Sequence, residues 1–140
     1  MVKLRNLIRL LVINMRRIFF IKMYGMHIHK RARVSFGAKL DKTNPKGIYI
    51  DADSYIASGV IIFTHDYARR IYKDTHIGKR CFIGANAIVM CGVTIGDEVI
   101  VGSGAIVTKD IPSNCIVVGN PAKIIKTDIH TGKFGQLITK

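Results

Sequence analysis

An aliphatic residue recurs at every sixth position in the second half of the chain. The positions are Ile77, Ile83, Val89, Ile95, Val101 and Val107, and glycine follows four of them. Helix faces recur at about 3.6 residues and strand faces at about 2, so this period belongs to neither element alone. We expect each hexad to form one short strand and one tight turn, with its aliphatic side chain directed into the axis of a coil. Because one coil cannot bury its own apolar face, the pattern predicts an all-β solenoid of stacked coils.

The same register extends toward the N-terminus and is interrupted twice. Earlier hexads begin at Ile28, Val34, Leu40, Ile50, Ile56 and Ile62. The register slips by four residues within 41–47, where Asn44-Pro45-Lys46-Gly47 is typical of a turn. It slips by nine residues between Ile62 and Ile77, which predicts a protruding loop over residues 66–76. The predicted organisation is a helix over residues 1–26, a solenoid over 27–126 and a C-terminal tail over 127–140.

Length and composition fit one domain. The chain has 140 residues and 49% hydrophobic content, which is enough for a core of its own. Its three cysteines, Cys81, Cys91 and Cys115, form no CxxC pair, and their odd number argues against a disulfide framework. We interpret them as small buried residues in a reducing setting, and we expect a cytoplasmic protein.

The net charge of +13 is unevenly distributed and is concentrated at the N-terminus. Residues 1–33 contain nine Lys or Arg and no acidic residue. In the same segment apolar residues recur at helical spacing, at Leu4, Leu7, Ile8, Leu11, Val12, Met15, Ile18 and Phe19. The pattern predicts a basic amphipathic helix. Its longest uncharged run, residues 10–15, is far shorter than the roughly 20 residues that a membrane-spanning helix needs.

Three kinds of partner are considered for this helix. Its apolar stripe can pack on the solenoid or on a neighbouring subunit and so cap an open end. Alternatively, residues 1–24 can lie on a membrane surface, with Lys and Arg attracted to anionic lipid. Nucleic acid is not expected as a partner, because the sequence contains no recognition motif and no arrangement of stacking aromatic residues.

Two segments near the end of the hexads carry a family resemblance. They are residues 101–112, VGSGAIVTKDIP, and residues 118–123, VGNPAK. Together with the hexads in register, they resemble the hexapeptide-repeat acyltransferases. The resemblance covers residues 28–126 and is greatest to the branch of maltose and galactoside O-acetyltransferases and the acetyltransferases of surface polysaccharide synthesis.

This resemblance implies a left-handed parallel β-helix of triangular section, with three hexads in each coil. It also implies a homotrimer whose active sites lie between subunits, with a protruding loop closing over each site. Acetyl-CoA is the implied co-substrate and lies along the solenoid wall. No metal is implied.

A histidine is the expected catalytic base. An alcohol is a poor nucleophile at neutral pH, and histidine can take its proton as the new bond forms. His65 lies just before the predicted loop, where the family carries its catalytic histidine, and His76 is the second candidate. Asp66 is preferred over a backbone carbonyl as the group that orients the ring, although neighbouring side chains on a strand point to opposite faces. Asp53, two hexads earlier, is expected on a different face.

The resemblance also assigns the acetyl-CoA site residue by residue. The matched positions are Ala85, Ser103, Thr108, Lys109, Lys123 and Lys126. The first two match small residues whose backbone groups hold the pantetheine arm, and the next two match a pair near the adenosine. The last two lysines match basic positions that face the nucleotide phosphates, with a solvated surface as the alternative interpretation.

We therefore predict an acetyl-CoA-dependent O-acetyltransferase that acts on a sugar hydroxyl in surface polysaccharide or glycan biosynthesis, peripheral to the inner membrane face. Candidates for the acceptor side are Asp51, Asp53 and Tyr55. N-acetylation of an amino sugar and acetylation of a xenobiotic are the alternatives. A non-catalytic scaffold and a carbonic anhydrase of the same fold are disfavoured, the latter because its zinc site needs three converging histidines.

Overall fold

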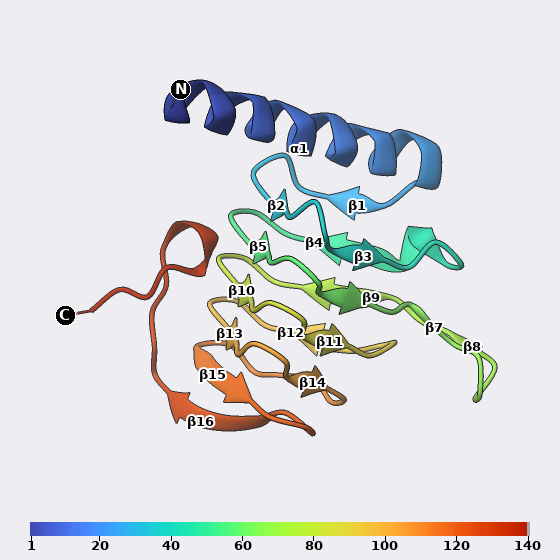
Figure 1. Ribbon diagram of the computed structural model, residues 1–140. Coiled ribbons are helices and arrows are strands. Elements are labelled where there is room, and N and C mark those ends of the chain that lie inside the picture. Colours follow the sequence, from blue (N-terminus) through green and yellow to red (C-terminus); the bar gives the residue numbers. More distant parts are fainter. Residues whose placement is uncertain (140) are drawn as a thin grey trace.

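The computed structural model describes residues 1–139 as one helix followed by a series of short strands (Figure 1). The helix α1 covers Val2–Tyr24. The first strands are β1 (His27–Ile28), β2 (Arg33–Val34), β3 (Lys39–Leu40), β4 (Ile48–Ile50), β5 (Tyr55–Ile56), β6 (Ile61–Ile62), β7 (His65–Asp66) and β8 (Ile71–Tyr72). The later strands are β9 (Thr75–Ile77), β10 (Phe82–Ile83), β11 (Ile88–Val89), β12 (Thr94–Ile95), β13 (Ile100–Val101), β14 (Ile106–Val107), β15 (Cys115–Val118) and β16 (Lys123–Thr127). Two short 3-10 helices, η1 (Pro45–Gly47) and η2 (Lys133–Gly135), complete the chain.

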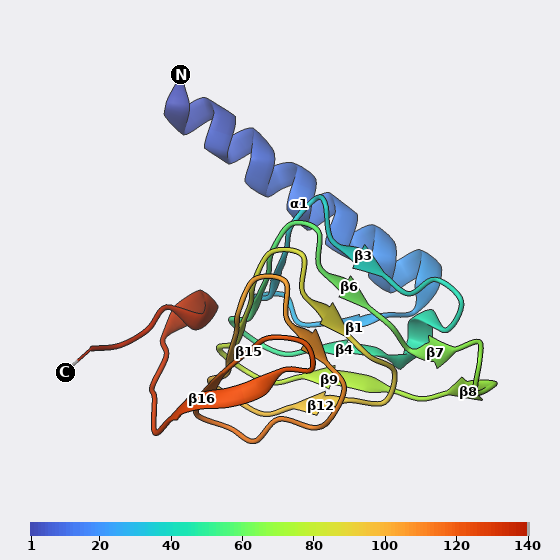
Figure 2. The same cartoon turned by 60° about the horizontal axis from the view of Figure 1, so that its bottom comes forward.

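Most of the strands form three parallel sheets, which the chain visits in turn. Sheet A contains β1, β4, β9 and β12, sheet B contains β2, β5, β10, β13 and β15, and sheet C contains β3, β6, β11 and β14. Strand β16 joins sheet B as an antiparallel edge strand on β15. Figures 1 and 2 show the result as a stack of coils, each of which is one circuit through the three sheets.

The predicted hexad leaders form three aliphatic columns inside the coils. They pair in register as Ile28, Ile50, Ile77 and Ile95 in sheet A, Val34, Ile56, Ile83 and Val101 in sheet B, and Leu40, Ile62, Val89 and Val107 in sheet C. All of them are buried. Burying one such side chain fully stabilises the fold by about 1.5–3 kcal/mol. The coils are so close that a Cβ on Gly84 would lie 2.7 Å from the backbone nitrogen of Ser103, which explains the glycine after the aliphatic residue.

Both interruptions of the register lie at one corner of the coils, where the chain passes from sheet C to sheet A. We call this edge the C–A corner, and the edge between sheets B and C the B–C corner. The first interruption, between β3 and β4, contains η1. The second, between β6 and β9, contains the antiparallel hairpin of β7 and β8, which projects from the coils (Figure 2).

The C-terminal tail returns along the coils. Thr131 is buried, and its hydroxyl donates a hydrogen bond to the carbonyl of Arg80 at 2.5 Å. The ring of Phe134 meets the ring of Tyr55 edge-on, with centroids 6.2 Å apart. The tail is therefore packed against strands of sheet B.

The three cysteines are free and buried. Burial raises the pKa of the Cys81 thiol to about 12, so this thiol stays protonated and unreactive at neutral pH. Their surroundings are those of structural residues.

Helix α1 lies across the first coil on the side that carries Ile13, Arg16 and Phe20. Ile13 and Phe20 are its buried residues, and the Arg16 guanidinium donates hydrogen bonds to the carbonyls of Ser35 and Ala38, both at 2.7 Å. The predicted apolar stripe is exposed at every position: Leu4, Leu7, Ile8, Leu11, Val12, Met15, Ile18 and Phe19. Of the partners considered for this stripe, the solenoid of its own chain is therefore excluded. The turn at 35–38 exposes carbonyl groups, and these accept the arginine.

The aliphatic columns predict that removing one buried leader is costly. Ile83 is 0% exposed and lies between Ile56 and Val101 in sheet B. We expect Ile83→Ala to lower the free energy of unfolding by about 2–5 kcal/mol. The control Ile125→Ala removes the same atoms from a 63% exposed side chain and should change it by less than about 0.5 kcal/mol. Urea unfolding followed by circular dichroism measures both, and equal losses would contradict the packing of the columns.

Candidate active site

His65 begins the hairpin that projects from the C–A corner. It is the first residue of β7 and follows Ile62, the leader of β6, at a distance of three residues. Asp41 occupies the same corner one coil earlier, directly after Leu40, which pairs with Ile62. The pairing of these two strands brings Asp41 and His65 into contact although they are 24 positions apart in sequence.

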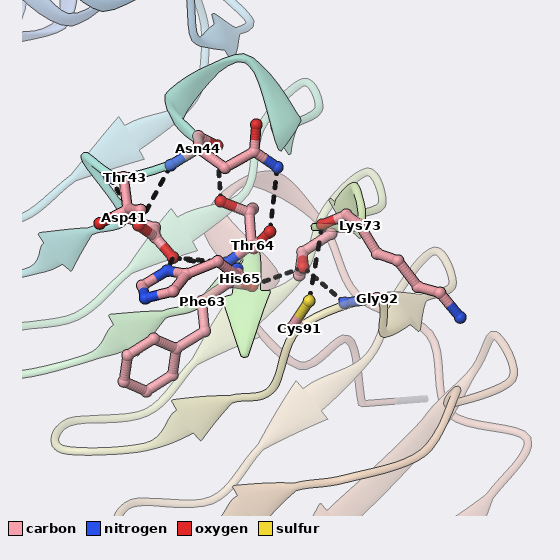
Figure 3. A network of polar contacts seen from close by, with 10 residues as sticks. Asp41, Thr43, Asn44, Phe63, Thr64, His65, Lys73, Cys91 and Gly92 are labelled. Carbon is pink, nitrogen blue, oxygen red and sulfur yellow. Dashed lines mark hydrogen bonds and ion pairs between the residues drawn. The ribbon is translucent and has the colours of Figure 1, made fainter. Parts of the chain in front are cut away.

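The Asp41 carboxylate accepts a hydrogen bond from Nδ1 of the His65 ring through Oδ2 (Figure 3). The Asp41 side chain is 2% exposed and that of His65 is 25% exposed. A buried carboxylate on Nδ1 fixes that nitrogen as the donor, so the lone pair of the neutral ring lies on Nε2. In Figure 3 the second ring nitrogen points away from Asp41.

Backbone amides complete the surroundings of the Asp41 carboxylate. Oδ2 accepts from the amides of Thr64 and His65 at 2.9 and 3.1 Å, and Oδ1 accepts from the amide of Thr43 at 2.8 Å. Burial alone would raise the pKa of Asp41, but hydrogen bonds from the Thr64 amide, the His65 ring and the Thr43 amide outweigh it and hold the pKa below its ordinary value. The carboxylate therefore stays ionised beside the histidine at neutral pH.

A reciprocal pair of hydrogen bonds fixes the two loops to each other. The side-chain amide of Asn44 donates to the carbonyl of Thr64 at 2.9 Å, and the Thr64 hydroxyl donates to the carbonyl of Asn44 at 2.6 Å. The Thr75 hydroxyl donates to the carbonyl of Phe63 at 2.6 Å and accepts from the amide of Gly92 at 3.1 Å. The segment that carries His65 is therefore held by hydrogen bonds to the preceding turn and to the following coils (Figure 3).

A cleft of about 600 Å³ opens beside His65. It is lined by Thr43, His65, Asp66, Tyr67, Ala68, Arg70 and Tyr72, so most of its wall comes from the hairpin. The ring of Tyr72 is inclined by 29° to the ring of His65, with centroids 6.4 Å apart. A cleft that combines aromatic rings with a few polar groups can receive a polar ring-shaped molecule.

Asp66 does not orient the histidine, and the preference for it is wrong. Its carboxylate accepts from Nε of Arg69 at 2.6 Å and from the amide of Arg69 at 3.1 Å. These hydrogen bonds from Arg69 lower the pKa of Asp66. Successive side chains of a strand point to opposite faces, so Asp66 cannot reach the ring while Asp41 holds Nδ1. The alternative of a backbone carbonyl fails as well, because Asp41 already accepts the hydrogen bond from Nδ1.

Asp41 was missed by the sequence reasoning, although a signal was present. Both interruptions of the register follow a leader of sheet C, Leu40 in one case and Ile62 in the other. Residues that begin the two interruptions therefore lie at the same corner. The first interruption begins with the acidic Asp41, and the second begins close to His65. The sequence alone does not show which way the His65 ring points, because its direction depends on how the 41–47 turn folds around Asn44.

Four of the residues assigned to acetyl-CoA lie at or beside the B–C corner. Ala85 follows β10 and Ser103 follows β13, while Lys123 and Lys126 lie exposed on β16. Among residues 1–139, the backbone amides of Ala85 and Ser103 have no hydrogen-bond acceptor. Small side chains and free amides let this corner take an amide-bearing arm close to the backbone, so the residues fit the pantetheine of acetyl-CoA.

The other two assigned residues lie on the opposite edge of sheet C. Thr108 and Lys109 follow β14 at the C–A corner and are exposed. Two strand spacings of about 4.8 Å separate this level of the corner from that of His65. One chain therefore presents His65, Thr108 and Lys109 on one edge, and the remaining assigned residues at or beside the other.

The candidates for the acceptor side and the second histidine lie elsewhere. Asp51, Asp53 and Tyr55 surround the corner between sheets A and B, and His76 stacks on Tyr49 in sheet A with centroids 4.4 Å apart. None of them lines the cleft beside His65. In the part of the chain that the structure describes, no three His, Cys, Asp or Glu residues are grouped closely enough to hold a metal ion.

The hexads correspond to a known sequence family. The family described as "Hexapeptide repeat of succinyl-transferase" matches residues 75–109. Serine acetyltransferase 2 of Arabidopsis thaliana is 34% identical over 110 residues, which cover 75% of this chain. The chain spans only 33% of the length of that relative.

Solved structures of two acetyltransferases are similar to most of this chain. The maltose O-acetyltransferase from Clostridium difficile 630 has a TM-score of 0.61 and 26% identity, with 80% of this chain and 74% of that chain covered. The polySia-specific acetyltransferase NeuO has a TM-score of 0.56 and 32% identity, with 73% of this chain and 53% of that chain covered. With its hexads in register and these relatives, the chain belongs to the hexapeptide-repeat acetyltransferase family.

Proposed function

We propose that this protein is an acetyl-CoA-dependent O-acetyltransferase whose acceptor is a sugar hydroxyl in a surface polysaccharide or another glycan. One observation carries the proposal: the His65 ring is held at Nδ1 by the buried Asp41 carboxylate and lines a cleft of about 600 Å³. Family membership supports acetyl transfer, and the geometry of the pair supports general-base catalysis by His65.

The two residues divide the proton chemistry between them. Acetyl-CoA supplies the acyl group as a thioester. Nε2 of His65 takes the proton of the acceptor hydroxyl while the hydroxyl oxygen forms the ester bond to the acyl carbon. The ring then returns this proton to the sulfur as the carbon–sulfur bond breaks. Asp41 remains ionised and stabilises the positive charge that develops on the ring.

Acetyl-CoA is held by backbone and cationic groups. The free amides of Ala85 and Ser103 bind the pantetheine arm. Lys123 and Lys126 form no ion pair with any residue among 1–139, so their charges remain available for the phosphates. Thr108 and Lys109, on the other edge of sheet C, lie beside the adenosine.

A sugar is the acceptor that the cleft favours. Tyr67 and Tyr72 present aromatic surface, and Thr43 and Arg70 present hydrogen-bond donors. Two structural neighbours are named for saccharide substrates, maltose and polySia. Free serine is the second candidate acceptor, because a serine acetyltransferase is among the relatives.

The active protein is a homotrimer of left-handed coils, with each active site completed between two subunits. The division of the assigned residues between the two edges of sheet C supports this assembly, because a neighbouring copy can bring its B–C corner to the hairpin of β7 and β8. The reaction takes place in the cytoplasm at the inner face of the membrane.

Release of CoA with a panel of acceptors tests the proposed reaction. We expect release with saccharides that carry free hydroxyls, and none with amino sugars lacking a suitable hydroxyl, with chloramphenicol-like xenobiotics or with serine. His65→Ala should lower kcat by about 10²–10⁴-fold because the general base is lost. His130→Ala is the matched control, since His130 is exposed and lies outside the cleft. Near-normal turnover in His65→Ala, or turnover with serine alone, would contradict the proposal.

Asp41→Asn tests the positioning role of the carboxylate. We expect kcat to fall by at least about tenfold while KM for acetyl-CoA stays unchanged. The variant removes the negative charge of the carboxylate beside Nδ1 and leaves the residues proposed to bind acetyl-CoA in place. Stability gives a second readout. The folded-state pKa of Asp41 lies below its unfolded value, so the ionised carboxylate stabilises the fold above pH values of about 4.

This stabilisation disappears as the pH falls through the lower folded-state pKa. Urea unfolding of the wild type and of Asp41→Asn should therefore show a difference at about pH 5 that shrinks in more acidic buffer, as the carboxylate becomes protonated. A difference that grows as the pH falls below about 5 would contradict the assigned direction. A change in KM for acetyl-CoA with kcat unaltered would remove Asp41 from the catalytic step.

The two β16 lysines test the donor site. We expect the double variant Lys123→Ala/Lys126→Ala to raise KM for acetyl-CoA by about tenfold or more, because each cation neutralises phosphate charge, and to leave kcat nearly unchanged. Lys39→Ala/Lys79→Ala is the control with the same loss of charge, on strand β3 and in the turn after β9. An equal rise in KM in the control would show that only the overall charge matters.

A further inference from the structure

Helix α1 is held with its orientation fixed. Besides its two hydrogen bonds to the coil, the Arg16 guanidinium lies over the rings of Phe20 and Phe36, at 4.7 and 5.4 Å from their centroids. Ile13 and Phe20 are buried beneath the helix. These contacts therefore determine which side of α1 faces away from the coils.

That outward side is apolar. It consists of Leu4, Leu7, Ile8, Leu11, Val12, Met15, Ile18 and Phe19, which we call the outer face. These side chains are between 41% and 65% exposed. An exposed apolar surface of this extent marks an interaction site, since isolated soluble chains rarely keep one.

Cations flank the outer face and no acid accompanies them. Lys3, Arg5, Arg9 and Lys22 are exposed on the same helix, and the first acidic residue of the chain is Asp41. A second copy docked face to face would bring two such sets of like charges together without a carboxylate from either helix to pair with them. An anionic surface complements both the apolar face and its cationic border.

We propose that the outer face of α1 docks on an anionic lipid bilayer, with the helix lying in the plane of the interface. An amphipathic helix with basic flanks binds in this way through its buried apolar area and its attraction to anionic headgroups. A helix of this length measures roughly 35 Å and can lie flat. No helix among residues 1–139 is long and apolar enough to cross a membrane.

The docking places the cleft near the lipid. Helix α1 covers the coil of β1, β2 and β3, and His65 stands at the corner of the next coil (Figure 1). The helix with its side chains is about 10 Å thick and the step between these coils is about 4.8 Å, so roughly 15 Å separates the bilayer surface from the level of the cleft. A saccharide anchored to the bilayer can therefore reach the cleft while its lipid stays in the membrane, a consequence that rests on the proposed function whereas the docking itself does not.

Sedimentation of the full chain with vesicles tests the docking. We expect binding to vesicles of equal parts phosphatidylcholine and phosphatidylglycerol, and much weaker binding to pure phosphatidylcholine. The triple variant Leu7→Ser/Leu11→Ser/Met15→Ser should weaken the partition by at least about 100-fold, because it removes apolar area without touching a cation. Ile125→Ser, exposed on β16 at the opposite end of the coils, should bind as the wild type does.

Two controls separate docking from other causes. The triple variant should keep the circular dichroism spectrum, the mass in solution and the turnover of a soluble acceptor, because its residues contact neither the core nor the cleft. Equal vesicle binding by wild type and triple variant would overturn the proposal. So would a triple variant of lower oligomeric mass whose wild-type parent ignores anionic vesicles, since the outer face would then be covered by a second copy.

Discussion

Each coil pairs with the next through its parallel strands, and this pairing fixes where every other part of the chain can lie. Parallel strands stack leader on leader, so every segment inserted between two hexads must leave and return at a fixed corner. Both insertions use the corner between sheets C and A. This coincidence places Asp41 one coil from His65 and lets a buried carboxylate hold an imidazole that a strand neighbour could not reach. The site is a product of the register and of the two segments that interrupt it.

The Asp41 carboxylate stabilises the loops of the site and also orients the His65 ring. The amides that hold Asp41 belong to the same two loops that carry the histidine and the reciprocal contact of Asn44 with Thr64. Ionisation of Asp41 therefore fixes the loops and sets the tautomer of the ring at once. In the proposed reaction such a pair is preorganised, so little reorganisation is needed when positive charge develops on the ring. At the end of the stack, Arg16 of α1 likewise donates hydrogen bonds to backbone carbonyls of the first coil. This contact leaves the apolar face of the helix directed outward.

Periodicity was sufficient to predict the strands, because hexad leaders such as Ile56 and Ile83 must pair to be buried. It also placed His65 at the edge of the protruding segment. It could not predict the partner of His65, since the 41–47 turn has no repeat and its contacts are between distant residues. It left the direction of α1 open, because spacing shows which residues of a helix share a face and not which face meets the coil. The burial of Ile13 and Phe20 and the bonds from Arg16 to the carbonyls of Ser35 and Ala38 fix that direction. The handedness of the coils is likewise absent from the spacing.

In the proposed site Asp41 holds His65 with its proton on Nδ1 and its lone pair on Nε2. Long-range ¹H–¹⁵N correlation NMR of the ring nitrogens, recorded where the ring is neutral, reports this tautomer directly. We expect the Nδ1–H form in the wild type and a mixed or inverted population in Asp41→Asn. An Nε2–H ring in the wild type would contradict this expectation, because the nitrogen facing the cleft could then no longer accept a proton.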